Sequence, residues 1–256
     1  MHHSALAFAW YYFWIVPHLL LFVIAAVMLR RGLHRQFPWF FTYLVSEGMF
    51  SIIAFVLTHI PSISEKEYGV FAIVQMIANV GVRFGIVYEL FSKLFVQYPA
   101  LVSLGRTALR WTIIVLLLLA VGLAGREPAG IQQRISFVAT ILDRSVSLVQ
   151  CGLVLLLFVF SSYFRLSWQN FVMGIAIGLG IFASVELSVA AVFAEIAPVT
   201  RNVQYIFDFA AMGTYHVCVL IWLGYLLAPE RVRQAAPLPA NDLKSWDREL
   251  QRLLQQ

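Results

Sequence analysis

The segment that decides the fold of this chain is Gly81-Val-Arg-Phe-Gly-Ile-Val-Tyr-Glu-Leu-Phe-Ser-Lys-Leu-Phe95. It contains an arginine, a glutamate and a lysine, yet the rest of it is apolar enough to lie in hydrocarbon. Of the 256 residues 61% are hydrophobic and only 12% are charged, whereas about a quarter of the residues of a soluble domain are charged. A chain of this length cannot hide so many long apolar runs in a water-soluble core. The composition therefore predicts an integral membrane protein.

Seven segments reach or approach the length of about 20 residues that a helix needs to cross a bilayer. They are roughly 8–29, 38–60, 69–96, 108–124, 134–160, 168–194 and 203–228. We therefore predict an all-α, seven-transmembrane helix bundle that forms one domain over residues 1–228. In the tail, residues 229–256, leucine and tryptophan recur at helical spacing among charged residues. This pattern predicts a short amphipathic helix over residues 242–255.

The distribution of basic residues predicts the orientation of the bundle. With the N-terminus outside, the loops, span ends and tail on the cytoplasmic side hold twelve of the 18 lysines and arginines, with Lys93 at the inner end of the third span among them, and the outer side holds four. Because positively charged loops stay on the cytoplasmic side, this bias predicts an outside N-terminus and a cytoplasmic C-terminus in a plasma or inner membrane. The basic residues flank the spans and leave no basic face for a phosphate backbone, so nucleic acid is not an expected partner.

Polar residues of the third span lie on one side of a helical wheel. Within an arc of about 120° fall Gln75, Asn79, Arg83, Glu89, Lys93 and Gln97. The fifth span carries a comparable stripe of Ser136, Thr140, Asp143, Ser147 and Gln150. A charged side chain that faces lipid costs about 2.5 kcal/mol or more near the helix centre. We therefore expect the stripes to face one another around a polar interior.

Acidic residues outnumber basic residues inside the predicted spans. The bases are Arg83, Arg144 and the more peripheral Lys93, and the acids are Glu47, Glu89, Asp143, Glu186 and Asp208. Two acids remain even if every base is paired. A carboxylate without a basic partner in hydrocarbon takes up a proton, or it faces water or a cation. We therefore expect at least one of Glu47, Glu186 and Asp208 to be protonated at neutral pH or to line a wet pocket.

The candidate site is a ligand or ion pocket between the helices, lined by central and outer polar residues. Its expected members are Arg83, Glu47, Asp143, Arg144, Glu186, Tyr205, Asp208 and His216. Toward the inner side, Glu89 and Lys93 stand four residues apart and are expected to neutralise each other as an inner pair. The alternative is that these charges form interhelical ion pairs whose only role is to fix the packing.

Motifs for catalysis and for metal binding are missing from the sequence. It contains no HExxH, no GxSxG, no Walker loop and no GxGxxG after a strand, so no enzymatic activity is expected. His18 and His216 could join Glu47 as ligands, but no histidine pair four residues apart and no cysteine ligands accompany them. We therefore predict no metal site.

The predicted topology resembles that of the rhodopsins and of the G-protein-coupled receptors, which have seven helices with the N-terminus outside. A rhodopsin binds retinal through a lysine of its last helix, and residues 203–228 contain no lysine. Many receptors have Glu/Asp-Arg-Tyr at the inner end of the third helix, where this chain has Tyr88-Glu89-Leu90. The resemblance is one of topology alone, so no residue role carries over and no cofactor is expected.

These patterns favour a heptahelical, receptor-like membrane protein that binds a small ligand or ion from the outside. Because the tail is too short for an output domain, the signal would pass to a separate cytoplasmic partner through the inner loops and the helix at 242–255. One alternative is a proton- or cation-coupled transporter or channel for small solutes, which the surplus of carboxylates favours. Another is a structural or accessory subunit of a larger membrane complex. The lipid bilayer surrounds the protein in each case. The sequence is also compatible with a homo-oligomer.

Overall fold

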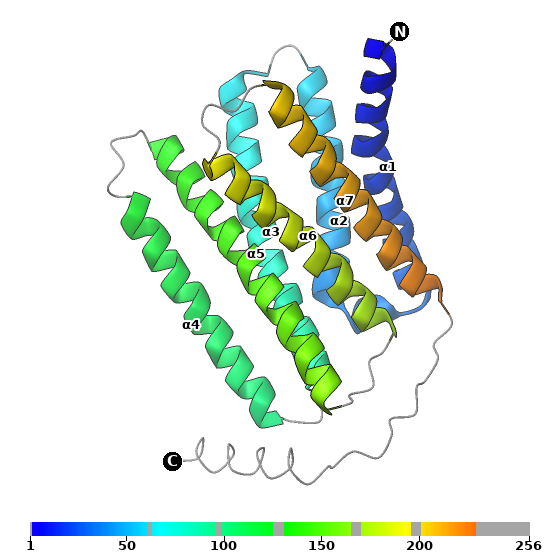
Figure 1. Cartoon of the computed structure of the whole chain (residues 1–256), viewed down its shortest axis with the longest axis vertical. Helices are drawn as coiled ribbons and strands as arrows, with labels where there is room; N and C mark the ends of the chain where they lie inside the picture. The colour runs from blue at the N-terminus through cyan, green and yellow to red at the C-terminus, as the bar shows by residue number, and fades with distance from the viewer. Residues whose placement is uncertain are drawn as a thin grey trace.

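Seven long α-helices make up the described part of the chain (Figure 1). The structure is a computed structural model that describes residues 2–60, 63–95, 99–124, 131–164, 170–195 and 201–228. The helices are α1 (His2–Arg30), α2 (Pro38–His59), α3 (Glu65–Leu94), α4 (Pro99–Ala124), α5 (Ile131–Phe164), α6 (Asn170–Glu195) and α7 (Arg201–Leu227), with a 3-10 turn η1 (Leu33–Arg35) between α1 and α2. The tail helix expected at 242–255 lies outside the described residues.

Five of these helices are long and apolar enough to cross a membrane. The candidate spans are Phe8–Arg30, Pro38–His59, Glu67–Lys93, Phe171–Val192 and Tyr205–Leu227. Many of their large apolar side chains are exposed, as contact with lipid requires. An all-helical fold with five such spans supports the prediction of a helical membrane protein. Seven crossings stay a prediction, because α4 and α5 are not among the five spans. The outside N-terminus also stays a prediction.

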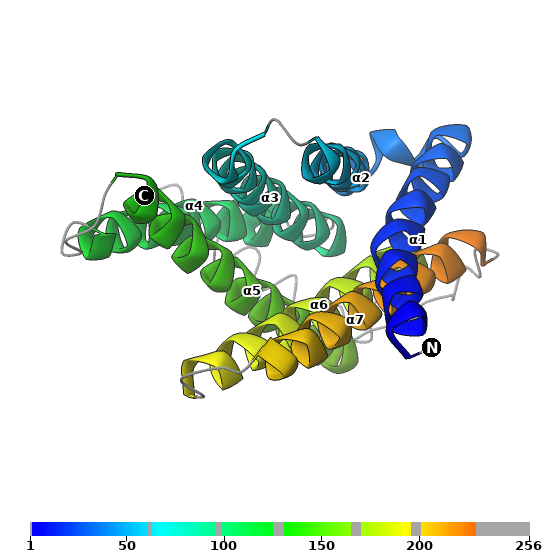
Figure 2. The ribbon, with the colours of Figure 1, turned by 90° about the horizontal axis from the view of Figure 1, so that it is seen from above.

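Six of the helices form a closed ring, and α4 lies outside it. Neighbours in the ring follow the order α1, α2, α3, α5, α6 and α7, and α7 packs back on α1. Helix α4 packs mainly on α5 and more lightly on α3. Consecutive helices run in opposite directions, so that the start of α1 and the end of α7 lie at opposite ends of the bundle (Figure 1). The view from above shows α4 beside α3 and α5 (Figure 2).

An apolar core rich in aromatic rings fills the half of the ring where α1, α3 and α7 end. We call this half, which the charge bias predicts to be cytoplasmic, the inner half. The indole of Trp222 is fully buried and lies edge-on to Phe40, with ring centroids 5.3 Å apart. Gly178 of α6 allows this packing, since a Cβ there would lie 2.2 Å from the indole nitrogen. The inner half is therefore filled mainly by apolar side chains, and the buried carboxylate of Glu89 lies among them.

Candidate functional site

A capping box fixes the start of α3 and therefore the position of Arg83. The Ser64 hydroxyl accepts a hydrogen bond from the backbone N–H of Glu67 at 3.3 Å, and the Glu67 carboxylate accepts from the backbone N–H of Ser64 at 2.8 Å. This exchange satisfies N–H groups that the first turn of a helix leaves free. Arg83 follows about five turns later, in the middle of the bundle.

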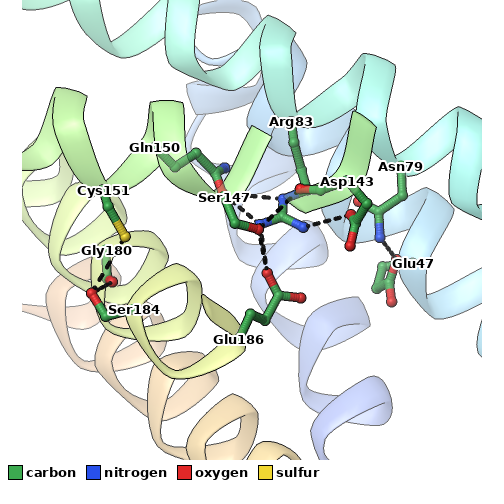
Figure 3. A network of polar contacts seen from close by, with 10 residues as sticks. All are labelled: Glu47, Asn79, Arg83, Asp143, Ser147, Gln150, Cys151, Gly180, Ser184 and Glu186. Atoms are coloured by element: carbon green, nitrogen blue, oxygen red, sulfur yellow. Dashed lines mark hydrogen bonds and ion pairs between the residues drawn. The ribbon is translucent and has the colours of Figure 1, made fainter. Parts of the chain in front are cut away.

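Arg83 connects α3 to α5 and α6 through its guanidinium (Figure 3). Nη1 lies 3.0 Å from a carboxylate oxygen of Asp143 on α5, and Nη2 lies 2.8 Å from a carboxylate oxygen of Glu186 on α6. The amide oxygen of Gln150 accepts hydrogen bonds from Nε at 3.1 Å and from Nη2 at 2.7 Å. We call Arg83, Asp143, Glu186, Ser147 and Gln150 the Arg83 centre.

Ser147 ties the two sides of the Arg83 centre together. Its hydroxyl accepts a hydrogen bond from Nη2 of Arg83 at 2.9 Å and donates one to Glu186 at 2.8 Å. One small side chain of α5 thus holds both the base of α3 and the acid of α6. Because both bonds involve a charged group, each is stronger than a neutral hydrogen bond.

The accessible side of the Arg83 centre is its acidic side. The Arg83 side chain is 3% exposed, whereas the Asp143 side chain is 33% exposed and the Glu186 side chain 28%. The ring of Phe182 lies against the guanidinium, 5.8 Å from Cζ to the centroid. A molecule that approaches the centre would therefore meet carboxylate oxygens before it met the arginine.

A third carboxylate lies one helical turn from Arg83, on the side toward the N-terminus of α3. Asn79 donates a hydrogen bond to the carboxylate of Glu47 on α2 at 3.2 Å, and Figure 3 shows this pair beside the Arg83 centre. Within the described residues this is the only hydrogen bond of Glu47, which forms no ion pair there. Three carboxylates thus surround one guanidinium, which gives the group a formal charge of minus two if all are ionised.

Two polar atoms near this group are buried and have no hydrogen-bond partner among the described residues. They are Oδ1 of Asn79 and Nε2 of Gln150. Buried polar groups are nearly always satisfied by protein or by ordered water. These atoms therefore mark where water or a polar ligand would bind.

Other residues predicted for the pocket lie elsewhere. Arg144 is exposed, since it follows Asp143 directly and adjacent helical residues point about 100° apart. The ring of Tyr205 is half exposed and lies 6.0 Å from that of Trp10. His216 contacts aromatic rings of α1. Asp208 is partly exposed and makes no hydrogen bond or ion pair within the described residues.

Glu89 caps a helix instead of pairing with Lys93. Its carboxylate oxygens accept hydrogen bonds from the backbone N–H groups of Trp39 and Phe40, both at 3.0 Å. These donors belong to the first turn of α2, whose N–H groups have no partner within the helix. Lys93 is exposed, with its ammonium 5.6 Å from the centroid of the Phe37 ring, and no ion pair joins it to Glu89 in the described structure. The free backbone donors of α2 attract this carboxylate away from its neighbour on α3.

Ser147, Gln150 and Asn79 complete the site, although the predicted pocket did not include them. All three belong to the polar stripes of the third and fifth spans, so the spacing of polar residues was the signal that could have identified them. No group of three or more His, Cys, Asp or Glu side chains in the described ranges is close enough to hold a metal ion.

Comparison of the chain with protein-family models, with curated proteins and with solved structures finds no match. Its function is therefore inferred from its own side chains.

Proposed function

We propose that this chain is a heptahelical, receptor-like membrane protein that binds a small cationic ligand or ion beside Arg83 and signals to a separate cytoplasmic partner. The observation that carries the proposal is the surplus of acid at the site. Asp143, Glu186 and Glu47 surround a single guanidinium, and the two acids that contact it are partly accessible. Uncompensated carboxylates in a membrane interior favour binding of positive charge.

Packing of the bundle supports entry of the ligand from the side opposite the inner half. The inner half is filled by buried side chains of α1, α2, α3, α6 and α7, with Trp222 among the largest. Polar access from that end would require this core to open. By the predicted orientation, the end opposite the inner half faces the outside.

A mechanical link from the site to the inner surface supports a signalling role. Binding of a cation to Asp143 or Glu186 would weaken the hold of these acids on Arg83, and so change how α3 sits against α5 and α6. Glu89 lies about 9 Å further along α3 and holds the first turn of α2. Movement of α3 would thus reach the η1–α2 turn at the inner surface.

The test places a fluorophore on that turn. Gln36 is exposed between η1 and α2, so Gln36→Cys in a Cys151→Ser background gives a labelling site. In lipid nanodiscs, titration with simple amines and with alkali and alkaline-earth cations is expected to change the fluorescence at saturable concentrations. No response to any of these cations would contradict the proposal.

Two variants, each of which replaces one carboxylate, show where the cation that changes the fluorescence binds. Glu47→Gln keeps an acceptor for Asn79 and leaves the ion pairs of Arg83 intact, yet it is expected to weaken the response at least about tenfold, because glutamine cannot release a proton in exchange for the cation as the Glu47 carboxyl can. Glu67→Gln is the matched control, because Glu67 is exposed and glutamine also completes a capping box. An equal effect of both variants would mean that the response arises at the surface.

A proton- or cation-coupled transporter is the second candidate, and Glu47 is the observation that favours it. A carboxylate without a basic partner can bind and release a proton during a transport cycle. Uptake into proteoliposomes that depends on a pH gradient and is lost in Glu47→Gln would favour the transporter over the receptor. Fluorescence changes without uptake would favour the receptor.

A further inference from the structure

A groove between α3, α4 and α5 has no role in the Arg83 centre. Its volume is 230 Å³, and its lining is mostly apolar, with Val87 and Phe91 from α3, Ala108 and Leu109 from α4, and Val149 from α5. It exists because α4 lies outside the helix ring and packs only lightly on α3. A space of this size and lining fits part of one acyl chain.

Arg106 lies beside this groove and is held in place by a tyrosine that lines it. Its Nε and Nη2 donate hydrogen bonds to the hydroxyl of Tyr88, at 3.2 and 2.8 Å. The guanidinium carbon also lies 5.6 Å from the centroid of the Tyr88 ring. Nη1 makes no hydrogen bond to any described residue. The guanidinium therefore keeps N–H groups that can donate hydrogen bonds to a ligand. Because Tyr88 already holds the side chain in place, Arg106 loses less conformational entropy when a ligand binds than a freely rotating arginine would.

The charged residues of α4 are all basic. Arg106 and Arg110 stand one turn apart, both are exposed, and the helix Pro99–Ala124 contains no aspartate or glutamate. Both arginines precede the long apolar run of α4, at the end of the bundle where α3 finishes. By the predicted orientation this end faces the cytoplasmic leaflet, whose surface carries negative charge.

We propose that this groove binds an anionic phospholipid, with an acyl chain against Val87, Phe91 and Leu109 and its phosphate on Arg106 and Arg110. Phosphate oxygens accept charge-assisted hydrogen bonds from guanidinium groups. An apolar helix in the same groove would bring no acceptor for these two cations and would remove water from them at a cost. The assignment does not depend on the function of the Arg83 centre.

The test compares lipids that differ only in charge. The protein is purified in an uncharged detergent and mixed with phosphatidylglycerol or with phosphatidylcholine of the same acyl chains, and native mass spectrometry counts the lipids retained. Phosphatidylglycerol is expected to be retained in preference to phosphatidylcholine. Arg106→Gln should reduce that preference about fivefold, the factor for one basic residue at a membrane surface. Tyr88→Phe, which removes the acceptor that fixes Arg106, should reduce it less.

Two further variants separate the groove from the general surface charge. Ala108→Trp fills the groove and is expected to abolish retention in a protein whose circular dichroism is unchanged. Arg30→Gln removes an exposed arginine of α1 at the same end of the bundle and should leave retention unchanged. Equal retention of both lipids, equal losses in Arg106→Gln and Arg30→Gln, or full retention in a folded Ala108→Trp would overturn the proposal. Thermal stabilisation by glycerol phosphate as large as that by phosphatidylglycerol would also overturn it, because the acyl chain would then have no role.

Discussion

Arg83 and Glu89 are two buried charges of the same helix, and they are stabilised in different ways. Arg83 is 2% exposed and Glu89 is 5% exposed, six residues apart on α3. The partners of Glu89 are backbone N–H groups at the start of α2, which cannot change protonation state. The partners of Arg83 include two carboxylates that can bind a proton or a cation. The difference teaches that the kind of partner, and not burial, separates a structural charge from a candidate binding site.

Loss of Arg83 is expected to have the largest effect on stability. Arg83→Gln leaves Asp143 and Glu186 facing each other without a base, and breaking a buried pair in this way costs about 3–5 kcal/mol of unfolding free energy. Unfolding in mixed micelles measures the loss. Replacing both acids as well, by Asp143→Asn and Glu186→Gln, should recover part of it because no buried charge is then unpaired. A loss no larger than that of Glu89→Ala would erase the distinction between the two charges.

Loss of Glu89 is expected to cost less and to leave ligand binding intact. Glu89→Ala frees two N–H groups at the start of α2, which corresponds to about 2 kcal/mol. The fluorescence response to cations, measured per folded molecule, should lose amplitude because Glu89 links α3 to the labelled turn, but it should keep its midpoint. A shifted midpoint would show that Glu89 belongs to the binding site.

Ser147→Ala tests the hydroxyl that joins Arg83 to Glu186. The variant removes one hydrogen bond to each of them but keeps both ion pairs, so the expected loss is about 1 kcal/mol. The same unfolding measurement applies. If the loss equalled that of Arg83→Gln, the hydroxyl rather than the charge pairing would hold the centre together.

Arg144→Gln should have the smallest effect on the unfolding free energy, under about 0.5 kcal/mol, because Arg144 makes no hydrogen bond or ion pair within the described residues. This variant separates the two neighbouring charges of α5, of which only Asp143 contacts Arg83. An effect comparable with that of Asp143→Asn would mean that Arg144 contributes to the centre after all.

The apolar runs predicted the approximate location of each helix more accurately than the residue at which it begins. The third helix begins at Glu65 rather than near 69, because the capping box at Ser64 sets its start before the apolar run. The fourth begins at Pro99 rather than near 108, since Arg106 and Arg110 interrupt the hydrophobicity but not the helix. The position of α4 outside the ring depends on packing between helices, which no single segment encodes.

The helical wheel predicted which residues of α3 face inward but not which neighbour each would meet. Arg83 and Glu89 lie at opposite edges of an arc of about 120°, so one reaches α5 and α6 while the other reaches α2. The carboxylate of Glu89 was expected on Lys93, but backbone donors of another helix are not visible in a residue pattern. Arg144 was grouped with Asp143 by sequence, although neighbours on a helix diverge.

Infrared spectroscopy of the carboxyl C=O stretch tests most directly whether acid exceeds base around Arg83. Glu47 has Asn79 as its only hydrogen-bond partner in the described residues, and Asp143 and Glu186 already share the one nearby base. We predict a protonated-carboxyl band at neutral pH that disappears in Glu47→Gln and persists in Glu89→Gln. A spectrum without such a band, or a band that is lost in Glu89→Gln and kept in Glu47→Gln, would contradict the surplus of acid at the Arg83 centre.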